Sequence, residues 1–194
     1  MWDSKRIRRI RCFGDSITAG WGVLPGKGWI AVLAGRMKQI SFCNYGMPGA
    51  GLSSVFRAAK AQEPVFAEGD GLFFMGGTND ILCGTRLAAV EALFEREIRR
   101  YAARYPVTVG IPPLATEQSI CTGWQSDFAF EANQRDLAAY GDFIRELGET
   151  LLLPILDCRE VLTEDSLYGD GIHPSEAGYR ALAEKAQTLW DPGR

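Results

Sequence analysis

Histidine is almost absent from this sequence, since His173 is the only one among 194 residues. No CxxC pair occurs, and the cysteines are odd in number and widely spaced: Cys12, Cys43, Cys83, Cys121 and Cys158. Structural zinc sites use clustered Cys and His, and disulfide scaffolds use paired cysteines. The sequence therefore predicts neither a metal site nor a disulfide framework. A reducing, cytoplasmic setting is expected.

Long apolar runs and excess positive charge are also missing. No run approaches the roughly 18 apolar residues of a membrane span, and none follows the charged N-terminus as in a secretory signal. The net charge is −3, so no nucleic-acid partner is expected. One basic cluster is interpreted as a solvated lead-in to the first strand, with a membrane surface or an acidic partner as the alternative: Lys5, Arg6, Arg8, Arg9 and Arg11.

Two common catalytic and nucleotide-binding motifs are missing as well. There is no Gly-x-Ser-x-Gly, which forms the nucleophile elbow of the usual α/β-hydrolases. There is no Walker-type phosphate loop either. Any serine chemistry or phosphate binding in this chain would need another arrangement.

What the sequence does contain is an alternation of short apolar runs with longer amphipathic stretches. The predicted strands are Ile7–Phe13, Ile40–Asn44, Gly71–Met75, Val107–Ile111 and Leu152–Asp157. The predicted helices are Trp29–Lys38, Leu87–Tyr105, Phe130–Leu151 and Ser175–Trp190. This alternation predicts an α/β fold with a parallel sheet covered by helices on both faces. The length fits one domain over residues 1–194.

In such a sheet, chemistry is expected just after the strands, at their carboxyl ends. Four polar or glycine-rich segments occupy those positions: residues 14–18, 44–51, 76–80 and 170–174. The last of these contains His173, which suits proton transfer near neutral pH. Asp170 lies three residues before it and can fix the imidazole tautomer by a hydrogen bond. Ser16 follows the first strand and provides a hydroxyl that such a base can activate.

The other two segments provide candidate donors for an oxyanion. Acyl transfer passes through a tetrahedral oxyanion that needs fixed hydrogen-bond donors. Gly49 can offer an unobstructed backbone N–H, and Asn79 can offer its side-chain amide. Gly46 and Gly51 compete with Gly49 for this role. Each residue taken alone is also typical of a turn or a helix cap.

Together, the four segments resemble the SGNH hydrolases, also called the GDSL lipase/esterase family. Gly14-Asp15-Ser16-Ile17-Thr18 is similar to the first block of that family, and Gly49 stands at the glycine of the second. Gly77-Thr78-Asn79-Asp80 is similar to the third block, and Asp170-Gly171-Ile172-His173-Pro174 to the fifth.

The resemblance covers nearly the whole chain and implies a three-layer, flavodoxin-like α/β/α fold with strand order 2-1-3-4-5. It implies a cofactor-independent esterase or lipase that acts on small-molecule carboxylic esters or thioesters. Ser16 would be the nucleophile, His173 the base and Asp170 its partner. The backbone N–H groups of Ser16 and Gly49 and the amide of Asn79 would form the oxyanion hole.

The connection Pro112–Phe130 is long and carries several aromatic residues. We expect it to wall an acyl pocket, with Trp124 and Phe128 as lining residues; the alternative is a hydrophobic patch packed on the domain. Three other functions stay open at this point. The glycines after the second strand could bind a nucleotide phosphate, the site could transfer acyl groups to an alcohol, or the domain could bind ligands without catalysis.

Overall fold

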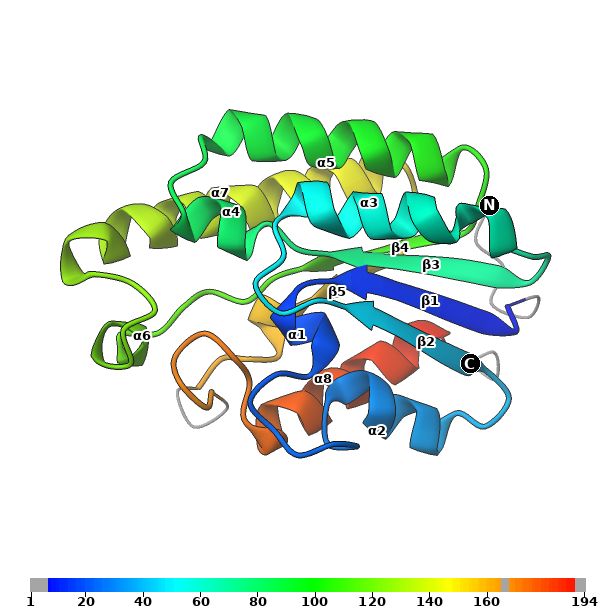
Figure 1. Ribbon diagram of the computed structural model, residues 1–194, viewed down its shortest axis with the longest axis horizontal. Helices are drawn as coiled ribbons and strands as arrows, with labels where there is room; N and C mark the ends of the chain where they lie inside the picture. The colour runs from blue at the N-terminus through cyan, green and yellow to red at the C-terminus, as the bar shows by residue number, and fades with distance from the viewer. Residues whose placement is uncertain (1–6, 165–167, 191–194) are drawn as a thin grey trace.

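The computed structural model describes residues 7–164 and 168–190, which form one five-stranded parallel sheet with helices on both faces (Figure 1). The strands are β1 Arg9–Gly14, β2 Ser41–Gly46, β3 Asp70–Met75, β4 Val107–Ile111 and β5 Ile155–Asp157. Their order is β2-β1-β3-β4-β5. The expected α/β fold and strand order are therefore confirmed.

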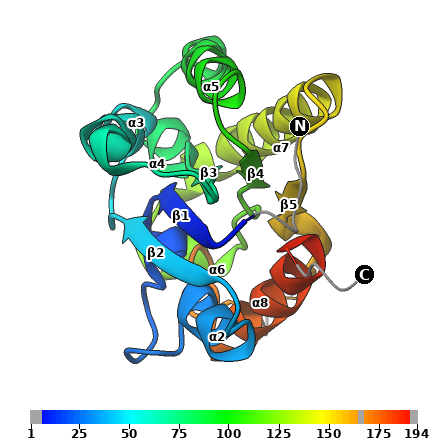
Figure 2. The ribbon, with the colours of Figure 1, turned by 90° about the vertical axis from the view of Figure 1, so that its right-hand side faces the viewer.

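The helices divide into two layers, which Figure 2 shows on opposite sides of the sheet. They are α1 Ser16–Ala19, α2 Trp29–Arg36, α3 Leu52–Gln62, α4 Thr78–Leu82, α5 Leu87–Ala102, α6 Gln118–Cys121, α7 Asp127–Thr150 and α8 Glu176–Trp190. Helices α3, α5 and α7 pack on one face around a core that includes Phe74 and Phe94. Helices α2 and α8 cover the other face, where Trp29 and Trp190 stack at 6.2 Å.

The strand register brings the candidate segments to one edge. Gly14 at the end of β1 pairs with Gly46 of β2 and with Met75 of β3. The residues that follow these three strands therefore leave the sheet side by side. In Figure 1 the strand arrows point toward the side where α1, α4 and α6 lie. The chemistry-bearing residues thus converge because parallel strands end at the same edge.

Most expected elements differ from the structure by a few residues at their ends, and two of these differences have a clear local cause. The last strand begins at Ile155 rather than Leu152, because Leu152 adopts a left-handed φ of 54° in the turn that closes α7. Helix α7 begins at Asp127 rather than Phe130, because Ser126 caps it and accepts a hydrogen bond from Ala129 N–H.

The expectation that the basic cluster is a solvated segment before the first strand is wrong for two of its arginines. Arg9 and Arg11 lie inside β1, and buried Arg11 donates from Nε to Asp70 Oδ2 at 2.7 Å. Because side chains alternate along a strand, Arg11 points to the face of the sheet that α3 covers. A buried, unpaired charge there would be costly, and the carboxylate of Asp70 neutralises it. Lys5 and Arg6 lie outside the described residues. Among the described residues, no helix is long and apolar enough to cross a membrane.

Candidate active site

Ser16 stands at the first position of α1, directly after β1. The chain turns sharply here because Asp15 caps the helix and accepts a hydrogen bond from Ile17 N–H at 3.0 Å. Gly14 permits the turn, since a Cβ there would lie 2.5 Å from the carbonyl oxygen of Met75. The result is a serine that is 7% exposed and fixed at the edge of the sheet.

Asp15 itself is almost completely buried, which makes it the most unusual carboxyl group near the site. Burial raises the pKa of Asp15 from 3.8 to about 6, although hydrogen bonds from backbone N–H groups, including those of Ile17 and Thr18, act in the opposite direction. The nearby charge of Asp80 raises it further. The carboxyl group that caps α1 therefore titrates between pH 4 and neutrality.

His173 and Asp170 are joined in a tight turn before α8. The Asp170 Oδ1 atom accepts hydrogen bonds from the backbone N–H groups of Ile172 at 3.0 Å and of His173 at 2.7 Å. Its Oδ2 atom lies 2.8 Å from His173 Nδ1. Gly171 makes this turn with a φ of 88°, a conformation that glycine adopts without strain.

The three residues form one continuous chain of contacts. His173 Nε2 lies 2.9 Å from Ser16 Oγ, although 157 positions separate the two residues in sequence. Burial alone would raise the pKa of Asp170, but the hydrogen bonds from the backbone and ring of His173 outweigh it, so the pKa lies below 3.8. An ionised Asp170 accepts a hydrogen bond from the Nδ1–H group of His173, which leaves Nε2 without a proton and able to accept one from the serine.

Gly49 lies in the loop between β2 and α3 in a left-handed conformation, with a φ of 75°. A Cβ on Gly49 would meet open space, whereas one on Gly46 would lie 2.2 Å from Ala19 N and one on Gly51 would lie 2.8 Å from Asp80 Oδ1. Gly46 and Gly51 therefore serve close packing. Of the three glycines, only Gly49 has an unobstructed side, as an approaching substrate requires.

Asn79 lies in the first turn of α4 and is tied to the same loop. Its Nδ2 donates to Ala50 O at 3.0 Å. An amide nitrogen carries two N–H bonds, and we find no acceptor for the second among the described residues. Asn79 is therefore anchored beside Gly49 while keeping one donor free.

The loop between β2 and α3 is a poor phosphate site, because a carboxylate already occupies the N-terminus of α3. Asp80 Oδ2 accepts a hydrogen bond from Leu52 N–H at 2.8 Å, at the first residue of α3. A phosphate would have to displace this carboxylate and would be repelled by its charge. The geometry thus disfavours the nucleotide-binding alternative. Asp80 acts as this cap from 28 positions away in sequence.

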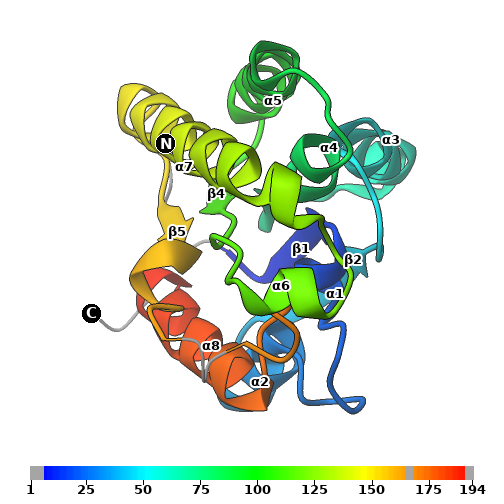
Figure 3. The same cartoon turned by 90° about the vertical axis from the view of Figure 1, so that its left-hand side faces the viewer.

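The structure separates the two expected pocket residues. Trp124 lies against the site, with its ring centroid 4.9 Å from that of His173 in an edge-on arrangement. Phe128 lies in the first turn of α7 and is 98% exposed, because α7 begins earlier than expected and turns it outward. The structure therefore brings Trp124, and not Phe128, to the candidate site. Figure 3 shows α6 and the segment that follows it crossing in front of the strand ends.

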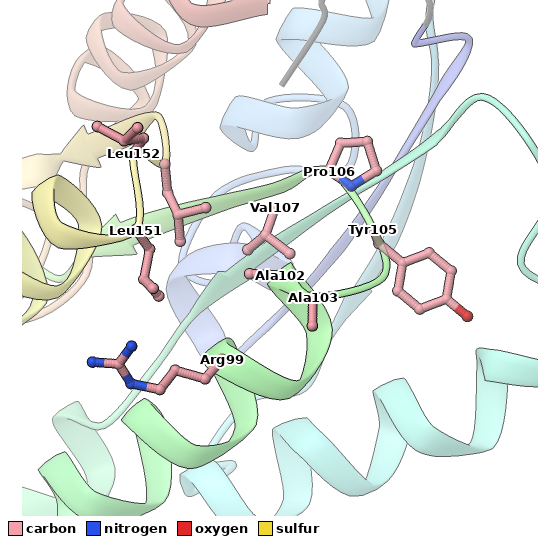
Figure 4. A pocket seen from close by; sticks show the side chains of 9 residues that line it. Arg99, Ala102, Ala103, Tyr105, Pro106, Val107, Leu151 and Leu152 are labelled. Carbon is pink, nitrogen blue, oxygen red and sulfur yellow. The ribbon is translucent and has the colours of Figure 1, made fainter. Parts of the chain in front are cut away.

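Two hollows differ in their relation to this site. One borders the end of α1 and is lined by Ala19, Gly20, Trp21, Gly22, Val23, Leu24 and Pro48. It lies between the Ser16 helix and the Gly49 loop, and Trp21 stands 6.4 Å from the His173 ring. The other, shown in Figure 4, includes Tyr105, Pro106 and Val107 at the amino end of β4. That hollow lies at the opposite end of the sheet from Ser16. Within the described residues, no group of three or more His, Cys, Asp or Glu is arranged to hold a metal ion.

The chain resembles known proteins in both sequence and fold. The model of the GDSL-like Lipase/Acylhydrolase family matches residues 12–181. No curated protein sequence matches the chain significantly.

Solved structures with the same fold include a member of the lipolytic protein G-D-S-L family from Veillonella parvula DSM 2008. It superposes with a TM-score of 0.83 at 23% identity, over 94% of this chain and 98% of that one. The acetyl xylan esterase AlAXEase superposes with a TM-score of 0.75 at 21% identity, over 93% and 98%. Axe2, an acetylxylan esterase from Geobacillus stearothermophilus, gives 0.74 at 20%, over 95% and 94%.

Proposed function

The chain belongs to the GDSL-like lipase/acylhydrolase family, whose members hydrolyse ester bonds, and from this premise we propose that it is a serine esterase working through Ser16, His173 and Asp170. The observation that carries the proposal is the 2.9 Å contact between Ser16 Oγ and His173 Nε2, continued by the 2.8 Å contact from His173 Nδ1 to Asp170. A serine hydroxyl becomes a nucleophile when a positioned base accepts its proton.

The reaction begins with attack of Ser16 Oγ on the ester carbonyl carbon. The hydroxyl proton moves to His173 Nε2, and the carbonyl oxygen becomes an oxyanion. His173 then donates that proton to the leaving alcohol as the carbon–oxygen bond breaks, which leaves an acyl-serine. Water, deprotonated by the same Nε2, attacks the acyl group, and the acid leaves as Ser16 recovers its proton.

The oxyanion is held by three donors in this proposal: the N–H groups of Ser16 and Gly49 and the free N–H of the Asn79 amide. Ser16 N–H is one of the first N–H groups of α1, which lack partners inside the helix. Gly49 has open space beside its backbone. The bond from Asn79 to Ala50 O supports the role of Asn79 because it holds the amide in place before substrate arrives.

Substrates of this reaction are small-molecule esters. The hollow between the end of α1 and the loop that carries Gly49 is lined mostly by apolar groups and small residues, and it suits one end of such an ester. No cofactor takes part, since each proton in the cycle is carried by His173. Transfer of the acyl group to an alcohol would use the same steps with that alcohol in place of water.

The experiment compares wild type with Ser16→Ala on p-nitrophenyl esters from acetate to decanoate, with folding checked by circular dichroism. We expect the variant to lose at least about 10⁴-fold in kcat, as loss of a serine nucleophile does. Equal rates in the two proteins would contradict the proposal. Adding a small alcohol such as methanol to the wild-type assay separates hydrolysis from transfer, because only transfer yields the methyl ester.

A further inference from the structure

The Asp170 carboxylate has a fourth hydrogen-bond donor that the proposed triad does not use. Three of its contacts come from its own turn: the N–H groups of Ile172 and His173 on Oδ1, and His173 Nδ1 on Oδ2. The fourth comes from Trp124, whose indole Nε1 donates to Oδ2 at 2.7 Å across 46 positions of sequence. A carboxylate offers about four acceptor directions, so these contacts occupy all of them.

The indole also lies against the histidine. The Trp124 ring meets the His173 ring edge-on at a centroid distance of 4.9 Å. Such an arrangement places the positive edge of one ring toward the negative face of the other and is favourable. One side chain therefore fixes the plane of the Asp170 carboxylate and borders the imidazole that this carboxylate orients.

The backbone around Trp124 is built to hold that position. Thr122 Oγ1 donates to Asp170 O at 2.7 Å, and Thr116 N–H donates to Gly171 O at 2.8 Å. The two segments are in such close contact that a Cβ on Gly171 would lie 2.2 Å from Ser119 N. Trp124 N–H in turn donates to Ser119 O at 2.9 Å, which closes the turn after α6.

We propose that Trp124 is a positioning residue for the His173–Asp170 pair, acting through its indole N–H on Asp170 Oδ2, and that residues 116–124 form a clamp that holds it there. The inference rests on the proposed function for its catalytic meaning. The indole bond stabilises the negative charge on Oδ2 and keeps that oxygen aligned with His173 Nδ1. Without the indole bond, Asp170 Oδ2 becomes a stronger hydrogen-bond acceptor for the protonated His173 ring, but its position is less well fixed.

This role differs from that of a pocket wall and predicts other kinetics. A wall residue contacts the substrate, so its loss changes KM and the chain-length profile. A residue that positions the base changes kcat and the pH dependence instead. Trp124→Phe separates the two, because phenylalanine keeps an aromatic ring beside His173 and removes only the N–H. Trp21→Phe is the matched control for the titration of His173, since Trp21 also borders the His173 ring, at 6.4 Å.

His173 is the only histidine, so the NMR signal of its ring Cε1 proton needs no assignment. We expect the titration midpoint of this signal to rise by about half a pH unit in Trp124→Phe and to stay unchanged in Trp21→Phe. Tyr179, which the Asp170 charge reaches, and Asp15, whose charge also acts on Tyr179, are the same in both variants. The pKa of Tyr179 is raised by burial and by the charges of Asp15 and Asp170, so it stays neutral throughout the titration.

In the ester assay, we expect Trp124→Phe to lower kcat about tenfold with KM within about twofold of wild type. A midpoint and a kcat that both equal those of wild type would overturn the inference. So would a change confined to KM or to chain-length preference, which would make Trp124 a pocket wall.

A third readout is measured on wild type. The chain has five tryptophans, and the indole N–H signal of Trp124 is the one that is missing in Trp124→Phe. In wild type this signal should shift with the same midpoint as the His173 proton, and a flat indole signal would contradict the coupling. Both NMR readouts work without turnover. A protein that hydrolyses no ester would therefore overturn the proposed function, while the indole contact would still be decided by the midpoints.

Discussion

The buried carboxyl group of Asp15 should make the stability of this protein depend on pH. The side chain is 1% exposed, and burial raises its pKa to about 6, compared with 3.8 in the unfolded chain. The folded protein therefore holds a proton on Asp15 between about pH 4 and pH 6 that the unfolded chain has already released. The contribution of this carboxyl to stability is complete below pH 4 and is lost as the pH rises through about 6.

The magnitude follows from the size of that change. One pKa unit corresponds to about 1.4 kcal/mol, so ionising Asp15 in the folded state costs about 3 kcal/mol at pH 7. Asp15→Asn keeps an oxygen that can accept from Ile17 N–H, and asparagine is as good a helix cap as aspartate. The variant therefore keeps the cap and removes the titration.

The assay is equilibrium unfolding in urea at pH 4, 5, 6 and 7, followed by tryptophan fluorescence. We expect the unfolding free energy of Asp15→Asn, relative to wild type, to increase by about 3 kcal/mol between pH 4 and pH 7. The matched control is Asp127→Asn, because the Asp127 side chain is exposed and no hydrogen bond or ion pair to it is found among the described residues. Its curve should run parallel to that of wild type. If the unfolding free energy of Asp15→Asn also ran parallel to that of wild type across this pH range, Asp15 would not hold a proton in the folded protein.

Three further predictions concern turnover. Asn79→Ala should lower kcat by about 10²–10³ while the melting temperature shows that the fold is kept, and normal activity would remove Asn79 from the oxyanion hole. Asp170→Asn should lower kcat by about 10⁴, because a neutral amide no longer stabilises the imidazolium; a loss below tenfold would contradict its role. Gly49→Ala should lower kcat/KM, since its left-handed φ of 75° strains alanine and the methyl group enters the open side of the loop. An unchanged kcat/KM would mean that substrate does not approach this backbone.

The convergence of the candidate site could be predicted because it depends on a general property of parallel sheets. Ser16, Asn79 and His173 follow apolar runs in the sequence, and residues after parallel strands gather at one edge. The distances between them could not be predicted. The 2.9 Å contact of Ser16 with His173 depends on how the turn before α8 folds back onto α1, and no local pattern encodes that.

Contacts between distant segments were missed for the same reason. Nothing near Trp124 in the sequence indicates that it donates to Asp170, and nothing near Asp80 indicates that it caps α3. Helix α3 itself was not among the predicted elements, although Leu52, Val55, Phe56 and Ala59 have helical spacing and are all buried. That pattern could have been found. Helix α7 begins early because Ser126 caps it, and this start turns Phe128 outward. In the sequence, the Ser126 cap signal competes with the aromatic residues, which favour a loop that lines a pocket.

Covalent labelling measures whether His173 activates the Ser16 hydroxyl as a nucleophile. A fluorophosphonate reacts with an activated serine, whose oxygen displaces fluoride from phosphorus, and the adduct is located by mass spectrometry of the digested protein. We expect one label, on Ser16, with none in Ser16→Ala and strongly slowed labelling in His173→Ala. An unlabelled wild type, a label on another serine, or equal rates of labelling with and without His173 would contradict this activation.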